Sequence, residues 1–410
     1  MTMNFASRWQ TFRAAPHRMM FFGGVTQSLL AIAWWLSELL SRYAGFFPAP
    51  AITVPPYAAH AFLMIYGFFP FFIFGFLMTA APNWVNGAKV EARFYVPAFL
   101  LMAAGIGLFY VGLYSGNDWL IGAVALYLAG MLTGWFALFK IVMESPHADK
   151  RHAYVVILVF LVGGLGAAAY LVWLASDQPL FLTLAISGGL WFFLLPIFVS
   201  VTHRMLPFFS STALRDYPLH RPYWALFALL AGMYAHGVME IAGAASWLWV
   251  VDLPMMAVAF HLSWRWGFHR CFEVRLVAVL HIAFLWLGIA LALYSLQSLA
   301  RLTGYAVLGM APLHALAIGY FSSMAIAMVT RVTLGHAGRP LVADGYTWAL
   351  FLGFQGTAIT RIAGDLPFVP TADAVHFYLL AACLWLVSFL LWARKYLPIY
   401  LRPRVDGRPG

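Results

Sequence analysis

Two histidines inside long apolar stretches are the residues of this sequence most suited to chemistry. Four other residues share the helical face of His60, namely Met64, Gly67, Phe71 and Met78. Three share the face of His314, namely Phe321, Ala325 and Met328. An imidazole in hydrocarbon is costly unless it has a ligand or a partner, so each histidine is a functional candidate. The alternative for each is a hydrogen-bonded core histidine.

Haem suits such faces, because it needs axial imidazoles, apolar walls around its ring and cations near its propionates. Small residues in both stretches would let a flat ring, or another helix, come close. Ordinary helix packing is the alternative, since stripes of Met and Phe usually belong to a core. We predict that His60 and His314 are the axial ligands of one b-type haem.

Carboxylates near the apolar stretches are few. Glu240 and Asp252 lie on neighbouring stretches joined by a short loop, and they are the first candidates for proton delivery. The alternative is an interfacial carboxylate that faces lipid headgroups. The spacings HxxxH and HxH are absent, so spacing alone supports a copper or non-haem metal site only weakly. Walker loops, GxGxxG after a strand and Ser/His/Asp arrangements are absent too, and nothing indicates nucleotide or hydrolase chemistry.

The composition requires membrane helices to position these residues. The chain has 410 residues, 63% hydrophobic and 9% charged, with a mean hydropathy of +0.84. Apolar runs of about 20 residues, enough to cross roughly 30 Å of hydrocarbon, recur along the whole chain. This excludes a soluble globular protein and predicts a single integral membrane domain, residues 1–410. Cys271 and Cys383 lack CxxC spacing and indicate neither a disulfide framework nor a metal cluster.

Twelve membrane-spanning helices in an all-α bundle are predicted. The first is an uncleaved helix that reaches residue 40. The others cover 57–80, 94–113, 119–139, 153–175, 180–202, 223–243, 247–264, 276–298, 305–330, 345–362 and 374–393.

The basic residues give an independent test of this topology, because cytoplasmic loops concentrate Lys and Arg. With the amino terminus inside, 21 of the 24 fall in cytoplasmic loops or tails, and the exceptions are Arg42, Arg301 and Arg361. Both termini are therefore predicted to be cytoplasmic. The net charge of +10 is spread over many short loops, which this topology in a lipid membrane explains. We therefore expect membrane lipids, and not nucleic acid, as partners. The same topology places His60 and His314 at similar depth near the outer surface.

Three blocks of the sequence carry a family likeness. They are HAFLMIYGFFPFFIFGFLMTAAPNW at 60–84, RMLPFF at 204–209 and HALAIGYFSSMAIAMVTRVTLGHAGRPL at 314–341. With LH at 280–281 and the closing LPIYLRPRVDGRPG, the likeness spans nearly the whole chain. On these blocks the sequence resembles the NnrS family, membrane proteins of bacterial nitric-oxide metabolism reported to carry haem and copper.

The resemblance implies which residues are functional. The family's motif histidines correspond to His60, His281, His314 and His336, and its motif arginines to Arg204, Arg331 and Arg339. A haem held by two histidines has no open position, so catalysis calls for a second metal centre. Its ligands must come from His203, His261, His281 or His336, and we expect His281 and His336 because they match family motifs. Arg331 and Arg339 would balance propionate or oxyanion charge there. His203 stands where we expect a small residue in many members, which speaks against a ligand role.

A more distant likeness, of architecture alone, is to the catalytic subunit of haem–copper oxidases and nitric oxide reductases. That subunit also has twelve helices, with low-spin haem ligands on the second and tenth. The present chain has no HxH on its tenth predicted helix and no His-His pair on its seventh. The second haem and the adjoining metal of that superfamily therefore do not carry over.

We interpret the chain as a multi-pass protein of the bacterial inner membrane that reduces nitric oxide to nitrous oxide. It would hold one or two b-type haems, with copper left open, and take electrons from a quinol or a cytochrome. The predicted catalytic residues are His281, His336, Glu240 and Asp252. Two alternatives stay open, a non-catalytic nitric-oxide-binding protein that protects against nitrosative stress, and a secondary transporter with broken helices and inverted repeats.

Overall fold

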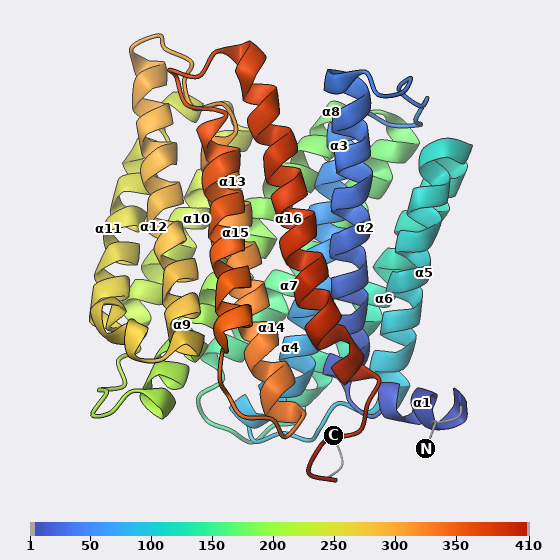
Figure 1. Cartoon of the computed structure of the whole chain (residues 1–410), viewed down its shortest axis with the longest axis vertical. Coiled ribbons are helices and arrows are strands. Elements are labelled where there is room, and N and C mark those ends of the chain that lie inside the picture. Colours follow the sequence, from blue (N-terminus) through green and yellow to red (C-terminus); the bar gives the residue numbers. More distant parts are fainter. Residues whose placement is uncertain (1–4, 408–410) are drawn as a thin grey trace.

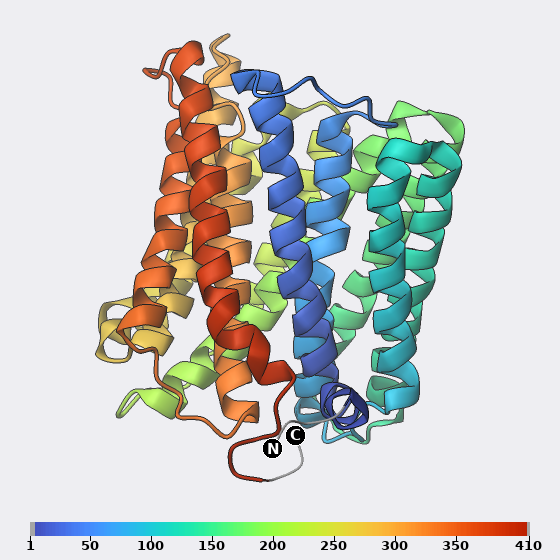
Figure 2. The same cartoon turned by 45° about the vertical axis from the view of Figure 1, so that its right-hand side comes forward.

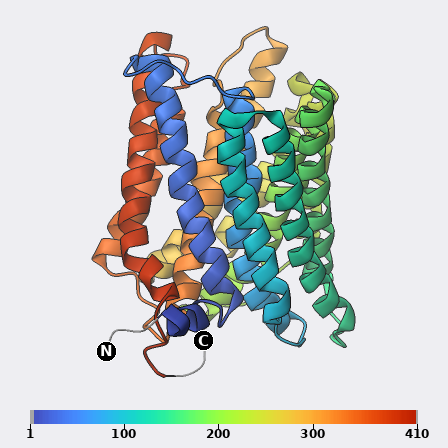
Figure 3. The same cartoon turned by 90° about the vertical axis from the view of Figure 1, so that its right-hand side faces the viewer.

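The computed structural model describes residues 5–407, and every regular element in that range is helical. The long helices stand side by side in one bundle, seen from three directions in Figures 1, 2 and 3. Helix α1 (Phe5–Phe12) and the last turn of α16 (Thr371–Tyr400) lie at the same end of this bundle (Figure 1). We refer to it as the terminal end and to the opposite end as the far end.

Each predicted span has a helical counterpart. The uninterrupted helices are α2 (Pro16–Ala44), α5 (Ala92–Ser115), α6 (Asn117–Glu144), α7 (Arg151–Ser176), α10 (Tyr223–Ile241), α11 (Trp249–Arg265), α12 (Arg275–Leu302), α15 (Gly345–Ala363) and α16. Short 3₁₀ turns, η3 (Ala245–Trp247) and η4 (Phe268–Glu273), flank α11.

Three further spans are composite, because each contains a π-helical segment. They are α3 (Pro56–Phe62), η1 (Leu63–Phe68) and α4 (Phe69–Trp84); α8 (Pro179–Thr183), η2 (Leu184–Leu194) and α9 (Leu195–Ala213); and α13 (Ala311–His314), η5 (Ala315–Ser322) and α14 (Ser323–His336).

Ten of these helical spans are long and apolar enough to cross a membrane. Helices α11 and α15 are not among them. With 17 residues, α11 is about 25 Å long, which is less than the roughly 30 Å of hydrocarbon. The chain is therefore a helical multi-pass membrane protein. The count of twelve spans and the cytoplasmic side of the termini stay predictions.

The composite spans form the interior of the bundle. The most apolar windows of the spans that begin at Pro56, Pro179 and Ala311 are 89%, 72% and 83% buried, against 28% for α16. One phenylalanine from each meets the other two: the ring centroids of Phe69, Phe198 and Phe321 lie 4.7 to 5.7 Å apart. Most side chains on these three spans therefore face protein rather than lipid.

Local sequence explains two of the π-helical segments. Pro70 has no N–H to donate to the carbonyl of Tyr66, and the hydroxyl of Tyr127 donates to that carbonyl instead. At the junction of η5 and α14, the hydroxyls of Ser322 and Ser323 donate to carbonyls five residues earlier. These bonds satisfy backbone groups that the wider turns displace from the α-helical pattern.

One predicted boundary was wrong. The span predicted at 305–330 begins at Ala311, so His314 lies in its first turn. Leu308 and the neighbouring glycines Gly304 and Gly309 adopt left-handed backbone conformations, and they hold residues 303–310 in a loop. Pro312 then starts the helix, a position where its missing N–H costs nothing.

Candidate functional site

His60 and His314 lie at the far end of two interior spans, each directly before or near a π-helical segment. His60 lies in α3, three residues before η1, and His314 is the last residue of α13 before η5. Single π turns inside α-helices are often found at functional sites, because they turn side chains out of register. Both histidines are half-buried, and His60 lies within electrostatic reach of His314. The structure thus places both predicted residues at the same end of the bundle, and their role as ligands stays a prediction.

The ring of His314 is held in one orientation. Its Nδ1 donates to the carbonyl of Met310 at 2.9 Å, and this bond leaves Nε2 as the free, lone-pair-bearing nitrogen. A backbone carbonyl on the second nitrogen is the usual way to orient a metal-ligating histidine. His60 stacks on Trp35, with ring centroids 4.1 Å apart, and its Nδ1 is buried without a hydrogen-bond partner. The donor chemistry of both residues fits an axial haem ligand.

Arg361 lies close enough to this pair for its positive charge to act on both His60 and His314. It bonds Asp365 at 2.7 Å and lies 4.1 Å from the ring centroid of Tyr378. By contrast, Arg331 is 17 residues beyond His314 on the same composite span, about 25 Å away along its axis. Arg331 therefore lies too far along the span to contact this pair.

A second polar site at the far end joins the two predicted carboxylates through a residue that sequence reasoning passed over. The Nδ1 of His236 lies 2.6 Å from an oxygen of Asp252, and its Nε2 lies 3.3 Å from Glu240. We call Asp252, His236 and Glu240 the acid–imidazole triad. His236 donates to both carboxylates only as an imidazolium, because a neutral ring has one N–H.

The surroundings of the triad differ at its two ends. The side chain of Glu240 is 33% exposed and accepts bonds from Ser187 and Trp191, both at 2.8 Å. Asp252 is fully buried, and its second oxygen has no hydrogen-bond partner. The ring of His236 stacks on Trp191, with centroids 3.4 Å apart. This geometry can take a proton at the accessible carboxylate and pass it through the imidazole to the buried one.

The predicted inner group does not have a shared environment. The Nε2 of His281 lies 2.9 Å from the hydroxyl of Ser210, and its Nδ1 is buried without a partner. His336 instead lies beside His17, with the two rings tilted and their centroids 4.8 Å apart. Among the residues the structure describes, no three His, Cys, Asp or Glu side chains are placed to hold one metal ion. A metal shared by His281 and His336 stays a prediction.

The motif arginines also have separate surroundings. Arg331 is buried, donates to Thr212 and lies 4.3 Å from the ring centroid of Phe209. Arg204 donates to the carbonyl of Trp84 and lies over its ring. Arg339 is exposed in the loop that follows α14.

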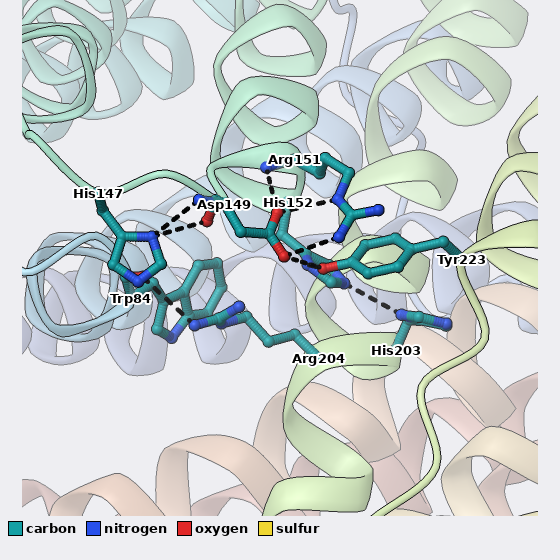
Figure 4. A network of polar contacts seen from close by, with 8 residues as sticks. All are labelled: Trp84, His147, Asp149, Arg151, His152, His203, Arg204 and Tyr223. Carbon is teal, nitrogen blue, oxygen red and sulfur yellow. Dashed lines mark hydrogen bonds and ion pairs between the residues drawn. The ribbon is translucent and has the colours of Figure 1, made fainter.

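Beside Arg204 lies a polar chain at the terminal end (Figure 4). Tyr223 donates to Asp149 at 2.9 Å, and His152 and His203 are 3.0 Å apart. Because the Nε2 of His203 donates to the carbonyl of Pro222, its Nδ1 must accept from His152. The hydrogen bond from Arg151 is the main cause that holds the pKa of Asp149 well below its usual range. These bonds account for His203 without a ligand role.

A partly open apolar cavity of about 40 Å³ lies between α4, α9 and α14. Its lining includes Phe72, Phe76, Phe198, Met324 and Ala325. Apolar cavities in proteins bind small apolar molecules and gases. A diatomic molecule fits this volume.

These features define a class, a multi-pass helical membrane protein whose far end holds an oriented histidine pair and a buried acid–imidazole triad. The family description "NnrS protein" matches residues 11–404 of the 410. The chain belongs to the NnrS family, which is linked to the response to nitric oxide. A comparison with curated proteins finds no match.

Two residues of the far-end sites were missed from sequence. Arg361 is one of only three basic residues outside the predicted cytoplasmic loops. An exception of this kind to the usual distribution of Lys and Arg could have marked it as a functional candidate. His236 carried a weaker signal, its four-residue spacing from Glu240 on one helix. No sequence pattern pointed to Asp252 as its second partner.

Proposed function

We propose that this protein acts on nitric oxide in the bacterial inner membrane and reduces it to nitrous oxide with the help of bound haem b. Membership of the NnrS family carries the proposal. The far-end pair supports it, because the bond from His314 to Met310 presents Nε2 as a ligand and His60 has an unused buried nitrogen. Haem, when bound, would supply an iron that exchanges electrons.

His60 and His314 would hold that haem, and Arg361, whose charge acts on both, would supply positive charge to balance its propionates. Trp35 covers one face of His60 and restrains its ring. The salt bridge from Arg361 to Asp365 keeps the guanidinium in place.

Substrate entry needs no polar channel, because nitric oxide is small and dissolves in the bilayer. The apolar cavity beside Phe198 and Ala325 would hold one molecule inside the bundle. Conversion of two nitric oxide molecules to nitrous oxide and water also consumes two protons and two electrons. A quinol or a cytochrome is the proposed electron donor.

The acid–imidazole triad would deliver the protons. Glu240 would take up a proton at its exposed side, and His236 would pass one from its Nδ1 to the hydrogen-bonded Oδ1 of Asp252. The other oxygen of Asp252 has no partner and is free to bond the next group along the route. This extends the predicted role of Glu240 and Asp252 by the imidazole that joins them.

A haem with two protein ligands has no open position, so turnover calls for a second haem or a copper ion. Of the two predicted inner ligands, His281 has an unused buried nitrogen and lies near polar Ser210. His336 lies among cations, which disfavour a metal ion. We therefore retain His281 as the candidate ligand of the second centre.

The test is a spectrum and a product assay on purified protein. Wild type should show a low-spin haem spectrum, and His60→Ala and His314→Ala should each remove or convert it. His376→Ala, on the outermost turns of α16, is the matched control and should leave the spectrum intact. With nitric oxide and a chemical reductant, wild type should form nitrous oxide and His281→Ala should not.

Two results would redirect the proposal. Stoichiometric binding of nitric oxide without turnover would leave a protective binding protein. Purified protein without haem would favour a proton-coupled transporter, a candidate supported by the π-helical interruptions and by the buried triad. Uptake driven by a pH gradient and lost in His236→Leu would then identify the transporter.

A further inference from the structure

A small pocket at the terminal end has no role in the function proposed above. It lies where the first turn of α2, the last turn of α14 and the last turn of α16 meet. Its polar lining residues are His17, Arg18, Thr333, His336 and Tyr400. Its volume of about 10 Å³ admits one water-sized group.

Arg18 places a buried positive charge beside this pocket. Its side chain is 3% exposed and donates to the carbonyls of Tyr400 and Arg402, at 3.1 and 2.8 Å. Within residues 5–407 it forms no ion pair with a carboxylate. A buried charge without an opposite charge is costly. The described part of the chain supplies no negative charge to Arg18, so an anion bound in the pocket would stabilise it.

The pocket also has donors without acceptors. The Nδ1 of His17 and the Nε of Arg18 are buried and have no hydrogen-bond partner. The hydroxyls of Thr333 and Tyr400 are 2.9 Å apart, and only one of their two hydrogens is used in that bond. The other hydroxyl hydrogen is available to an acceptor, as are the two nitrogens when they carry hydrogen.

The positive charges around the pocket favour an anion over a metal cation as its ligand. Arg18 and Arg404 act on both His17 and His336, and Lys89 acts on His336. The first turn of α2 contains no acidic residue, so the positive end of its helix dipole is uncompensated there. Two imidazoles in such a field would bind a metal cation poorly, whereas an anion would be attracted by every one of these groups.

We propose that the pocket formed by His17, Arg18, Thr333, His336 and Tyr400 binds an oxyanion of the phosphate type. One anionic oxygen enters the pocket and accepts from His17 and Arg18, while the rest of the group stays at the mouth beside half-buried His336. A lipid headgroup phosphate and free phosphate share this chemistry. The proposal does not depend on haem or on nitric oxide.

The test measures thermal unfolding of the delipidated, detergent-solubilised full chain against ligand concentration. The probes are inorganic phosphate, with chloride at matched ionic strength, and dioctanoyl-phosphatidylglycerol, with phosphate-free dioctanoylglycerol. Saturable stabilisation by phosphate supports the site and identifies a free anion. Saturation by the phospholipid alone supports the site and identifies a headgroup.

Variants locate the effect. Arg18→Gln should weaken the apparent affinity about tenfold or more, because it removes a charge-assisted hydrogen bond. Arg93→Gln, an exposed arginine paired with Glu91, is the matched control and should bind like wild type. If Arg18→Gln does not fold, His336→Gln replaces it, since that side chain is only half-buried.

Three results would overturn the proposal. The first is stabilisation by neither probe beyond its control. The second is equal affinity in wild type, Arg18→Gln and His336→Gln. The third is saturable binding of zinc or copper that His17→Gln abolishes, without any anion effect.

Discussion

His236→Leu is the substitution that tests the acid–imidazole triad most directly. It removes the hydrogen-bond donor 2.6 Å from Asp252, whose other oxygen already has no partner. Asp252 is fully buried, so the substitution leaves a carboxylate without a donor inside the bundle. Leucine is apolar and can still pack on Trp191, which limits the loss of packing.

The expected loss can be worked from these contacts. Removal of one member of a buried ion pair costs about 3–5 kcal/mol of unfolding free energy, because the remaining charge is uncompensated. Glu240 contributes little to that loss, since Ser187 and Trp191 still donate to it. The double variant His236→Leu/Asp252→Leu has no buried charge at this site. Its stability should return to within about 1 kcal/mol of wild type.

The assay is unfolding by SDS titration in mixed micelles, followed by tryptophan fluorescence. Glu240→Gln is the control, because its amide oxygen can keep a bond from Ser187 or Trp191, and we expect a loss of about 1 kcal/mol. If His236→Leu is as stable as wild type, or if the double variant recovers nothing, the imidazole does not hold Asp252 as argued.

Three other predictions concern the terminal loops, the topology and the cavity. Asp344→Ala should cost about 1 kcal/mol by loss of the α15 cap, whereas Asp344→Asn should lose mainly the bond to Lys395. The bond from Lys395 is the main cause that lowers the pKa of Asp344 to about 2. Wild type should therefore lose the stability contributed by the ionised carboxylate as the pH falls from about 4 towards 2, which acid unfolding curves would measure. A reporter fused after residue 145 should be cytoplasmic and one within 303–310 periplasmic, and the reverse result would invert every depth assignment. Ala325→Val should be neutral or stabilising by up to about 1 kcal/mol in SDS titration, because the larger side chain fills part of the apolar cavity. A loss above about 2 kcal/mol would show that the cavity has no space for the added methyl groups.

The membrane class and most helix positions could be read from sequence because hydropathy acts locally. A run of about 20 apolar residues must hydrogen-bond its own backbone in hydrocarbon, and a helix does this without long-range information. The boundary at Ala311 failed for the same reason. Residues 305–310 are apolar enough to continue the helix, but Gly304, Leu308 and Gly309 adopt backbone conformations that hydropathy does not record.

The histidine pair at the far end could be predicted because depth on a helix follows from counting. Residues 60 and 314 lie near the starts of spans that enter from the same side, so their heights agree whatever the packing is. The family motifs pointed to the same residues, and the match over residues 11–404 confirms the family itself.

Which side chains meet across the bundle was decided by tertiary structure alone. The sequence placed Glu240 and Asp252 at one depth but did not show that His236 lies between them. It also did not show that His281 lies beside Ser210 and His336 beside His17. Helix position along the chain determines height in the membrane. Rotation about the helix axis and the choice of neighbouring helix depend on packing between different helices, and a single sequence carries no direct signal of that packing.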